Sequence, residues 1–281
     1  MSSSETGAAV DITRDYYDSD DADRFYFNIW GGEDIHIGLY ADDGVPISEA
    51  SRLTVEKMAG LLGITSDTRV LDLGAGYGGS ARYLVERFGC SVVCLNLSGV
   101  QNERNRSKNA ENPVFKDKID VIDASFDDIP LEANSFDLVW SQDAILHGAD
   151  KARVFSEIRR VLKTGGELIF TDPMQAAGVS RADLQPILDR IHLESMGSFE
   201  LYEKLAGENG MSKVEIIDLS EHLPRHYGSV LRDLQQREEQ LKADGLVSAE
   251  YMERMKKGLG HWIEAGGAGR LRWGILRFRV D

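Results

Sequence analysis

Cysteine is scarce in this chain of 281 residues, which holds only Cys90 and Cys94. Both fall in one predicted strand, where their separation corresponds to roughly 13 Å, too far for a disulfide bond. Two cysteines alone do not form a zinc site, and the histidines at 192, 222 and 261 do not have the spacing of metal ligands. We therefore expect a reduced protein that holds no metal.

Long hydrophobic runs are missing as well. No stretch approaches the roughly 18 apolar residues that a membrane-spanning helix requires. Residues 1–10 are small and polar, without the apolar centre of a signal peptide. These absences predict a soluble, cytoplasmic protein with no membrane partner.

Positive charge is in the minority. The chain has 32 Lys and Arg residues against 47 Asp and Glu residues, a net charge of −15 at pH 7. Binding of DNA or RNA depends on clustered Lys and Arg that displace counterions, so nucleic acid is not an expected partner. The composition, 42% hydrophobic and 28% charged, is that of a globular protein rather than a disordered one.

Strand-like and helix-like segments alternate from residue 69 onward, which predicts an α/β fold with a mostly parallel sheet covered on both faces. An earlier helix is expected over 48–62, with Ser48 as its N-cap. The apolar runs that predict strands are Arg69–Leu73, Ser91–Leu97, Ile119–Ile122, Phe136–Ser141, Glu167–Asp172, Val214–Leu219 and Leu271–Val280.

Two long segments interrupt the alternation, Met174–Phe199 and His222–Ala265. The second predicts two helices, one with an apolar stripe formed by Tyr251, Met255, Leu259 and Trp262. These segments fit either a cap over one edge of the sheet or additional packing helices, and the sequence leaves both interpretations open.

A glycine-rich turn follows the first strand, in the stretch Asp72-Leu73-Gly74-Ala75-Gly76-Tyr77-Gly78-Gly79. Gly74, Gly76 and Gly79 match the G-x-G-x-x-G pattern of dinucleotide sites, which bind a pyrophosphate at a helix N-terminus. Asp72 argues against that ligand, because a carboxylate repels phosphate and attracts an ammonium group. The second strand ends at Asn96 instead of the acidic residue that binds a dinucleotide ribose.

Four motifs in sequence order resemble those of the class I S-adenosylmethionine-dependent methyltransferases. They are the glycine stretch at 72–78, Asp123-Ala124-Ser125, the strand at 136–141 and the turn Val161–Gly166. The resemblance implies a seven-stranded Rossmann-like sheet of order 3-2-1-4-5-7-6, with the last strand antiparallel. It also implies S-adenosylmethionine as the cofactor, bound at the carboxyl ends of strands 1 and 4.

The same resemblance implies roles for individual residues. Asp72 would meet the amino group of the cofactor, and Asn96 stands where the family has an acidic residue on the ribose, with Gln101 as a second contact. Asp123 and the Ala124 amide would bind the adenine. The full set of expected cofactor contacts is Tyr26, Trp30, Ile37, Gly38, Asp72, Gly74, Ala75, Gly76, Asn96, Leu97, Gln101, Asp123, Ala124, Ser125, Ser141, Gln142 and Leu146.

Residues 16–40 and 141–147 further resemble amine N-methyltransferases. The resemblance is strongest to the sarcosine/dimethylglycine N-methyltransferases, which make glycine betaine, and extends more weakly to phosphoethanolamine N-methyltransferases. It is carried by Ile29–Tyr40, Trp140–Asp143, Asp172–Gln175, Gln185–His192 and Leu223–Tyr227, besides the glycine turn. In the phosphoethanolamine enzymes a Tyr and a His form a catalytic pair, at the positions of Tyr17 and His147 here.

The reaction explains these residue types. An amine must lose a proton before it attacks a methyl group, and His147 would accept that proton, while Tyr17 would orient the nitrogen. Tyr16, Tyr17, Phe25, Tyr26 and Trp30 offer aromatic faces to a quaternary ammonium product, although Phe25 and Trp30 fit an apolar core better. Expected contacts of the substrate and its carboxylate are Tyr17, Asp143, Arg190, Arg225, His226 and Tyr227. The candidates for the carboxylate are Arg190, Arg225 and His226, and the 224–227 stretch is the first choice.

From these expectations the chain divides into an N-terminal lid segment (1–47), a cofactor-binding core (48–173), cap helices (174–212), a core strand (213–221), cap helices (222–265) and a final core strand (266–281). The alternatives that remain are methylation of another small amine, such as glycine or phosphoethanolamine, a structural role for His147, cofactor binding without catalysis, and a nicotinamide-dependent oxidoreductase built on the same glycine pattern.

Overall fold

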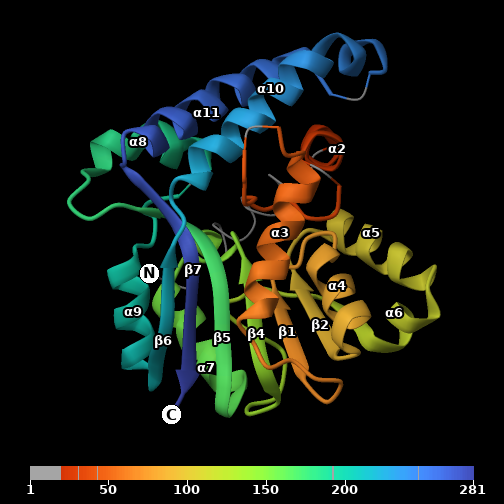
Figure 1. The fold of residues 1–281 in the computed structure, drawn as a ribbon, viewed down its shortest axis with the longest axis vertical. Coiled ribbons are helices and arrows are strands. Elements are labelled where there is room, and N and C mark those ends of the chain that lie inside the picture. The colour runs from red at the N-terminus through yellow and green to blue at the C-terminus, as the bar shows by residue number, and fades with distance from the viewer. Residues whose placement is uncertain (1–19, 31, 43, 192, 246) are drawn as a thin grey trace.

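A computed structural model describes residues 20–30, 32–42, 44–191, 193–245 and 247–281. Within them one sheet has the strand order β3-β2-β1-β4-β5-β7-β6 (Figure 1). Strand β7 runs antiparallel to β5 and β6, and the other neighbours are parallel. The expected fold class and strand order are confirmed. The strands are β1 (Arg69–Leu73), β2 (Ser91–Asn96), β3 (Ile119–Asp123), β4 (Phe136–Gln142), β5 (Leu162–Gln175), β6 (Met211–Asp218) and β7 (Leu271–Val280).

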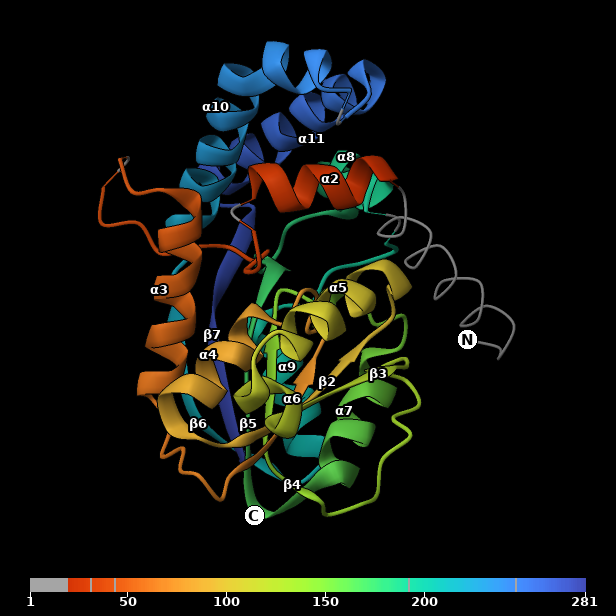
Figure 2. The same ribbon diagram turned by 90° about the vertical axis from the view of Figure 1, so that its right-hand side faces the viewer.

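Helices cover both faces of the sheet (Figure 2). On one face lie α3 (Ile47–Gly60), α4 (Gly79–Phe88), α5 (Gly99–Ala110) and α6 (Pro113–Lys118); on the other lie α7 (Lys151–Val161) and α9 (Phe199–Glu208). Successive residues of β4 alternate between the two apolar cores: Leu138 and Trp140 pack toward α3 and α4, and Val139 packs toward α7. Burial on both sides explains the almost continuous apolar runs of the strands.

Four helices gather above the carboxyl edge of the parallel strands: α2 (Asp20–Ile29), α8 (Arg181–Arg190), α10 (His222–Ala243) and α11 (Ala249–Gly267) (Figure 1). Helices α10 and α11 lie side by side in both ribbon views. The predicted stripe of α11 is buried at all four positions, Tyr251, Met255, Leu259 and Trp262. These helices cover the edge of the sheet where ligands of open α/β folds bind.

The structure differs from the sequence-based expectations at several element boundaries. Helix α3 begins at Ile47, directly after Pro46, and no side chain caps it, so the assignment of Ser48 as N-cap is wrong. Strand β5 continues beyond the expected Asp172, because its antiparallel pairing with β7 extends to Gln175. Helix α6 was not predicted; it is a short helix that starts with Pro113 and is capped by Asn112.

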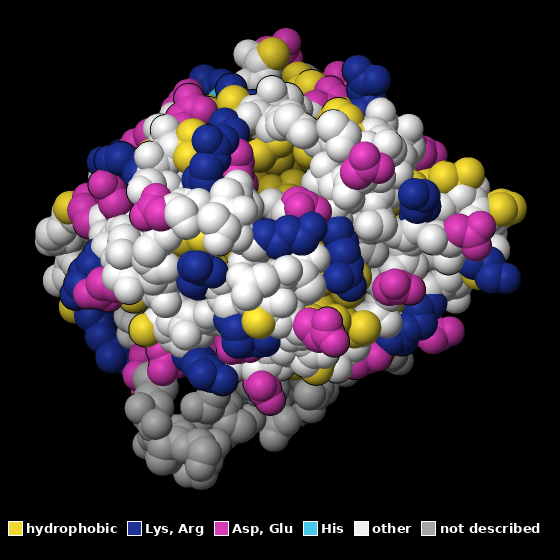
Figure 3. Space-filling model, turned by 90° about the horizontal axis from the view of Figure 1, so that it is seen from below, with side chains coloured by type: hydrophobic (Ala, Val, Ile, Leu, Met, Phe, Trp, Pro, Cys, Tyr) yellow, Lys and Arg dark blue, Asp and Glu magenta, His cyan; other side chains and the backbone are white. Residues whose placement is uncertain are grey.

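The described part of the chain contains neither a disulfide bond nor a membrane-spanning helix. Cys90 and Cys94 are both buried free thiols. Among the described helices, none is long and apolar enough to cross a membrane. On the face of the molecule away from the cap, Lys and Arg side chains are interspersed with Asp and Glu side chains (Figure 3).

Candidate active site

The turn between β1 and α4 depends on glycines in a left-handed backbone conformation. Gly74 has φ 77° and Gly78 has φ 78°, a region that side chains disfavour. A Cβ atom at Gly74 would also overlap the Ala144 side chain, and one at Gly78 would overlap the Asn105 side chain. The sequence places glycine here because the backbone must turn sharply between tightly packed neighbours.

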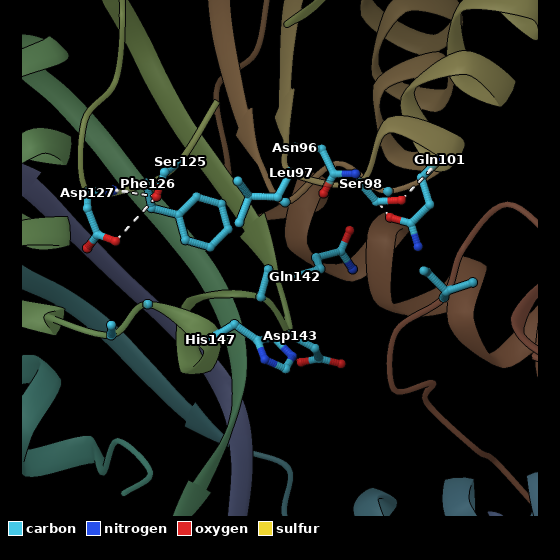
Figure 4. Close-up of a pocket in the computed structure, with 16 residues that line it drawn as sticks. Asn96, Leu97, Ser98, Gln101, Ser125, Phe126, Asp127, Gln142, Asp143 and His147 are labelled. Carbon is cyan, nitrogen blue, oxygen red and sulfur yellow. Dashed lines mark hydrogen bonds between the residues drawn. The ribbon is translucent and has the colours of Figure 1, made fainter. Parts of the chain in front are cut away.

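A pocket of about 770 Å³ opens beside this turn (Figure 4). Nine of the sequence-predicted site residues line it: Gly74, Gly76, Asn96, Leu97, Gln101, Ser125, Gln142, Asp143 and His147. The other residues that line it are Ile35, Ser98, Phe126, Asp127, Ala144, Gly148 and Ala149. In Figure 4 the end of β2 with Gln101 lies on one side, Ser125, Phe126 and Asp127 on another, and Asp143 and His147 below.

Several polar atoms in and beside this pocket have unused hydrogen-bonding capacity. Asn96 donates to the Gln101 side-chain oxygen at 3.0 Å, whereas the Gln101 amide nitrogen is buried without a partner among the described residues. The Gln142 amide nitrogen is in the same situation. Because unsatisfied buried polar atoms are costly, these atoms fit a polar ligand such as a ribose.

Asp72 provides a comparable observation at the end of β1. Its side chain is 3% exposed, and within the described chain one carboxyl oxygen has no hydrogen-bond partner. Burial first, and the nearby Asp34 carboxylate second, together raise its pKa to about 7. A buried carboxyl group of this kind fits a ligand that carries an ammonium group, as S-adenosylmethionine does.

Other expected cofactor residues stabilise the ends of the strands and do not line the pocket. Asp123 forms an ion pair with Arg106 and accepts a hydrogen bond from Asn102 at 2.6 Å. The Ala124 amide donates to the Asn96 carbonyl at 3.3 Å, and the Ser141 hydroxyl donates to the Leu73 carbonyl at 2.7 Å. Ala75 and Gly38 also lie outside the pocket lining.

A second pocket, of about 540 Å³, lies between the sheet edge and the cap. Its aromatic wall is formed by Tyr26, Trp30, Tyr227 and Trp262, with ring centroids 5.3 Å apart for Tyr26–Trp30, 5.8 Å for Trp30–Tyr227 and 4.9 Å for Tyr227–Trp262. The remaining residues that line it are Ile35, His36, Ile37, Asp143, Leu146, His147, Pro173, Arg190 and Ile191.

The two pockets share Ile35, Asp143 and His147. Asp143 has a left-handed backbone conformation with φ 51°, and its carboxylate accepts hydrogen bonds from the Ile37 amide at 2.6 Å and the Trp273 indole at 2.8 Å. Backbone strain of this kind concentrates at functional sites. We call these three residues the seam between the pockets.

His147 is the last residue of η1 (Ile145–His147), a single 3₁₀ turn after β4. Burial lowers the pKa of its imidazole to about 4, with a further contribution from the Lys151 ammonium. The imidazole is therefore neutral at physiological pH, which is the form of a histidine that can act as a proton acceptor.

The remaining substrate candidates fall in different places. Arg190 and Tyr227 line the second pocket, whereas Arg225 and His226 line neither pocket. The Arg225 guanidinium donates to the Tyr40 carbonyl at 3.5 Å. The buried His226 accepts from the Gly38 amide at 3.2 Å through Nδ1, and Tyr16 and Tyr17 lie outside the described residues.

Sequence reasoning missed several residues of the two pockets. Trp262 was visible as part of an apolar stripe, but the stripe alone predicts burial and not contact with a ligand. Ile35 and His36 lie in an irregular segment without periodicity. They belong to the Ile29–Tyr40 stretch that carries the family resemblance, but that resemblance implied no role for either residue. Tyr26 and Trp30 line the second pocket, together with the expected cofactor contacts Ile37 and Leu146.

Comparison with known proteins gives a consistent result. Residues 71–170 match the family model of a methyltransferase domain. The chain is 54% identical over 272 residues to the sarcosine/dimethylglycine N-methyltransferase of Halorhodospira halochloris, covering 96% of each chain. It is 48% identical to the protein of the same description from Aphanothece halophytica, covering 96% of this chain and 97% of that one. A crystal structure described as a sarcosine dimethylglycine methyltransferase from Galdieria sulphuraria superposes with a TM-score of 0.88 at 47% identity, covering 94% of this chain and 98% of that chain.

Proposed function

Because this chain belongs to the family of sarcosine/dimethylglycine N-methyltransferases, we propose that it transfers methyl groups from S-adenosylmethionine to sarcosine and dimethylglycine, and so forms glycine betaine. The observation that carries this proposal is the seam of Ile35, Asp143 and His147, which lines both pockets. A methyl donor in the first pocket would meet an amine in the second pocket at this seam. Such positioning supplies much of the rate of a displacement reaction.

S-adenosylmethionine, when bound, supplies an electrophilic methyl group on a sulfonium sulfur. Asp72 would bind its ammonium group, and Asn96 with Gln101 would bind the ribose hydroxyls. Three buried atoms without a hydrogen-bond partner among the described residues support this assignment. They are the side-chain amide nitrogens of Gln101 and Gln142 and one carboxyl oxygen of Asp72. Leu97 and Phe126 provide apolar walls for the adenine, with Asp123 and Ala124 at the end of the adjacent strand.

His147 would accept the proton that the amine must lose. Sarcosine and dimethylglycine are mostly protonated at neutral pH, so one proton would leave the nitrogen before its lone pair attacks. The new bond from nitrogen to carbon would then form as the carbon–sulfur bond of the sulfonium donor breaks, with that electron pair left on sulfur. A neutral imidazole in the pocket wall is suited to take up this proton. Tyr17 remains the expected partner that orients the nitrogen.

The second pocket suits a small amine that carries a carboxylate. The four aromatic rings would attract the developing ammonium charge, at about 0.5–2 kcal/mol for each good cation–π contact. Arg190 would pair with the substrate carboxylate, with the Tyr227 hydroxyl beside it. Among the described residues that line this pocket, Arg190 is the single Lys or Arg, which favours a carboxylate over the doubly charged phosphate of phosphoethanolamine.

The experiment is a turnover assay with S-adenosylmethionine against glycine, sarcosine, dimethylglycine and phosphoethanolamine, with release of S-adenosylhomocysteine as the readout. We expect turnover of sarcosine and dimethylglycine, little of glycine and none of phosphoethanolamine. His147→Ala should lower kcat by about 10²–10⁴-fold while the cofactor Kd stays within twofold. Cofactor binding without turnover of any of the four amines would refute the proposal.

The same assay separates the two arginine candidates. Arg190→Met should raise KM for dimethylglycine at least tenfold, because the carboxylate loses a charged bidentate partner. Arg225→Met is the matched control: it makes the same chemical change outside both pockets, so KM should stay within twofold. A larger effect of Arg225→Met than of Arg190→Met would move the carboxylate site to the 223–227 segment.

A further inference from the structure

Lys151, the first residue of α7, holds the backbone on both sides of His147. Its ammonium group donates to the Leu146 carbonyl at 3.2 Å and to the Gly148 carbonyl at 3.3 Å. These carbonyls belong to the residues directly before and after His147. The turn itself is closed by two backbone hydrogen bonds. The His147 amide donates to the Ala144 carbonyl at 3.0 Å, and the Gly148 amide donates to the Ile145 carbonyl at 2.9 Å.

Asp172 holds the same turn from the sheet side. This fully buried residue of β5 accepts a hydrogen bond from the Leu146 amide at 3.1 Å through one carboxyl oxygen. Its other oxygen accepts a hydrogen bond from the hydroxyl of Tyr202, a fully buried residue of α9. Side chains from α7 and β5 therefore anchor the peptide groups around His147, and α9 in turn fixes the carboxylate.

We propose that Lys151 and Asp172 are positioning residues that hold the His147 imidazole at the seam between the two pockets. This inference rests on the proposed function. A half-buried Lys and a fully buried Asp each carry a desolvation penalty that apolar residues of similar size would avoid. Lys151 donates to the carbonyl groups on both sides of His147, and one oxygen of Asp172 accepts from the amide directly before it. In an active site a displacement of about 1 Å can lower the rate 10²-fold. Precise placement of His147 would therefore explain why the desolvation penalty of Lys151 and Asp172 is tolerated.

The Lys151 charge has a second effect on the same imidazole. Burial comes first and the Lys151 charge second in keeping the pKa of His147 low. Burial lowers the pKa of the Lys151 ammonium group, while the Asp172, Asp127 and Asp150 carboxyl groups act in the opposite direction and support its charged form. Asp143, His36 and Arg190 line the second pocket together with His147. Removing the Lys151 charge should raise the pKa of His147, so that acid inactivates the enzyme at a higher pH.

The test compares Lys151→Met with Lys151→Arg and with Lys204→Met, a control that removes a well-exposed lysine of α9. The measurements are kcat for dimethylglycine between pH 3.5 and 9, the S-adenosylhomocysteine Kd by calorimetry, and the melting temperature. For Lys151→Met we expect kcat to fall 10–100-fold at pH 8, the Kd to stay within threefold, and the acid limb of kcat to move up by at least one pH unit. Lys151→Arg should recover most of kcat, and Lys204→Met should match the wild type.

A fall in kcat that Lys151→Arg does not reverse, or one matched by an equal loss of S-adenosylhomocysteine affinity and of melting temperature, would overturn the inference, because a purely structural role predicts that pattern. Unchanged kcat would overturn it as well. If Lys151→Met fails to fold, Asp172→Asn tests the proposal instead. We expect this variant to lower kcat without an upward shift of the acid limb. A normal kcat would contradict the proposal. His147→Ala separates failure of this inference from failure of the proposed function. If that variant kept full activity, His147 would not be the proton acceptor, and the proposed function would lose its assigned base.

Discussion

At the scale of single residues, Asp72 is the clearest case of a side chain that suits a ligand better than it suits the fold. Its carboxyl group is buried with one oxygen unpartnered within the described residues, and its pKa is raised to about 7 by burial and then by Asp34. The folded protein therefore binds a proton at Asp72 more tightly than the unfolded chain does. The associated stability is present at low pH and is lost as the pH rises through 7.

Asp72→Asn should therefore stabilise the ligand-free protein at alkaline pH. We expect its free energy of unfolding to exceed that of the wild type by a margin that grows by about 2 kcal/mol from pH 5 to pH 8, since one pKa unit corresponds to 1.36 kcal/mol. Urea titration at the two pH values measures this. The same variant should bind S-adenosylhomocysteine at least tenfold more weakly. A constant margin across pH would mean that Asp72 titrates normally.

Residues that touch the expected ligands were predictable from the sequence only where a local motif marks them. The glycine turn identifies Asp72, Gly74 and Gly76, and the S-Q-D-A-I-L-H stretch identifies His147. For the substrate carboxylate the sequence favours the 224–227 stretch with Arg225 over Arg190. Only the packing of the cap against the sheet separates them: Arg190 lines the second pocket and Arg225 does not.

At the scale of elements, the turn from β1 into α4 combines tight packing with a positive φ. Gly78→Ala should destabilise the protein by more than 1 kcal/mol, because the new Cβ meets Asn105 and the backbone stays left-handed. Gly60→Ala is the matched control at the end of α3, where an added Cβ has nothing within 4 Å. That control should be neutral or stabilise by about 0.5–1 kcal/mol. Thermal unfolding of both variants checks the pair, and equal effects would argue against strain in the turn.

Strands were easier to predict than the cap. Each core strand is a short apolar run between polar segments, and the period of the pattern is visible in a single sequence. The strand order came from resemblance to a family, because pairing of distant strands leaves no local signal. The cap contributes Tyr227, Trp262 and Arg190 to one pocket from three different helices. No local pattern predicts that these three meet, since each helix shows only its own apolar stripe.

At the scale of the whole molecule, the net charge of −15 opposes compaction through mutual repulsion. Raising KCl from 0.05 to 0.5 M shortens the screening length to a few ångströms and should weaken that repulsion more than it weakens the surface ion pairs. We expect the melting temperature to rise by several degrees, with sucrose at equal osmolality as a control for nonelectrostatic effects. A falling melting temperature would mean that ion pairs such as Arg82–Glu33 and Arg277–Glu167 dominate.

The seam between the pockets also bears on which alkyl group the enzyme can move. Ile35 is the aliphatic member of the three shared residues, and its branched side chain lines both pockets where they meet. Replacing it by alanine removes three carbon atoms at the boundary and leaves Asp143 and His147 in place. Both pockets would widen where they meet, and we expect this boundary then to accommodate an ethyl or allyl group in place of methyl. This one position makes the fold a starting point for a designed alkylating catalyst.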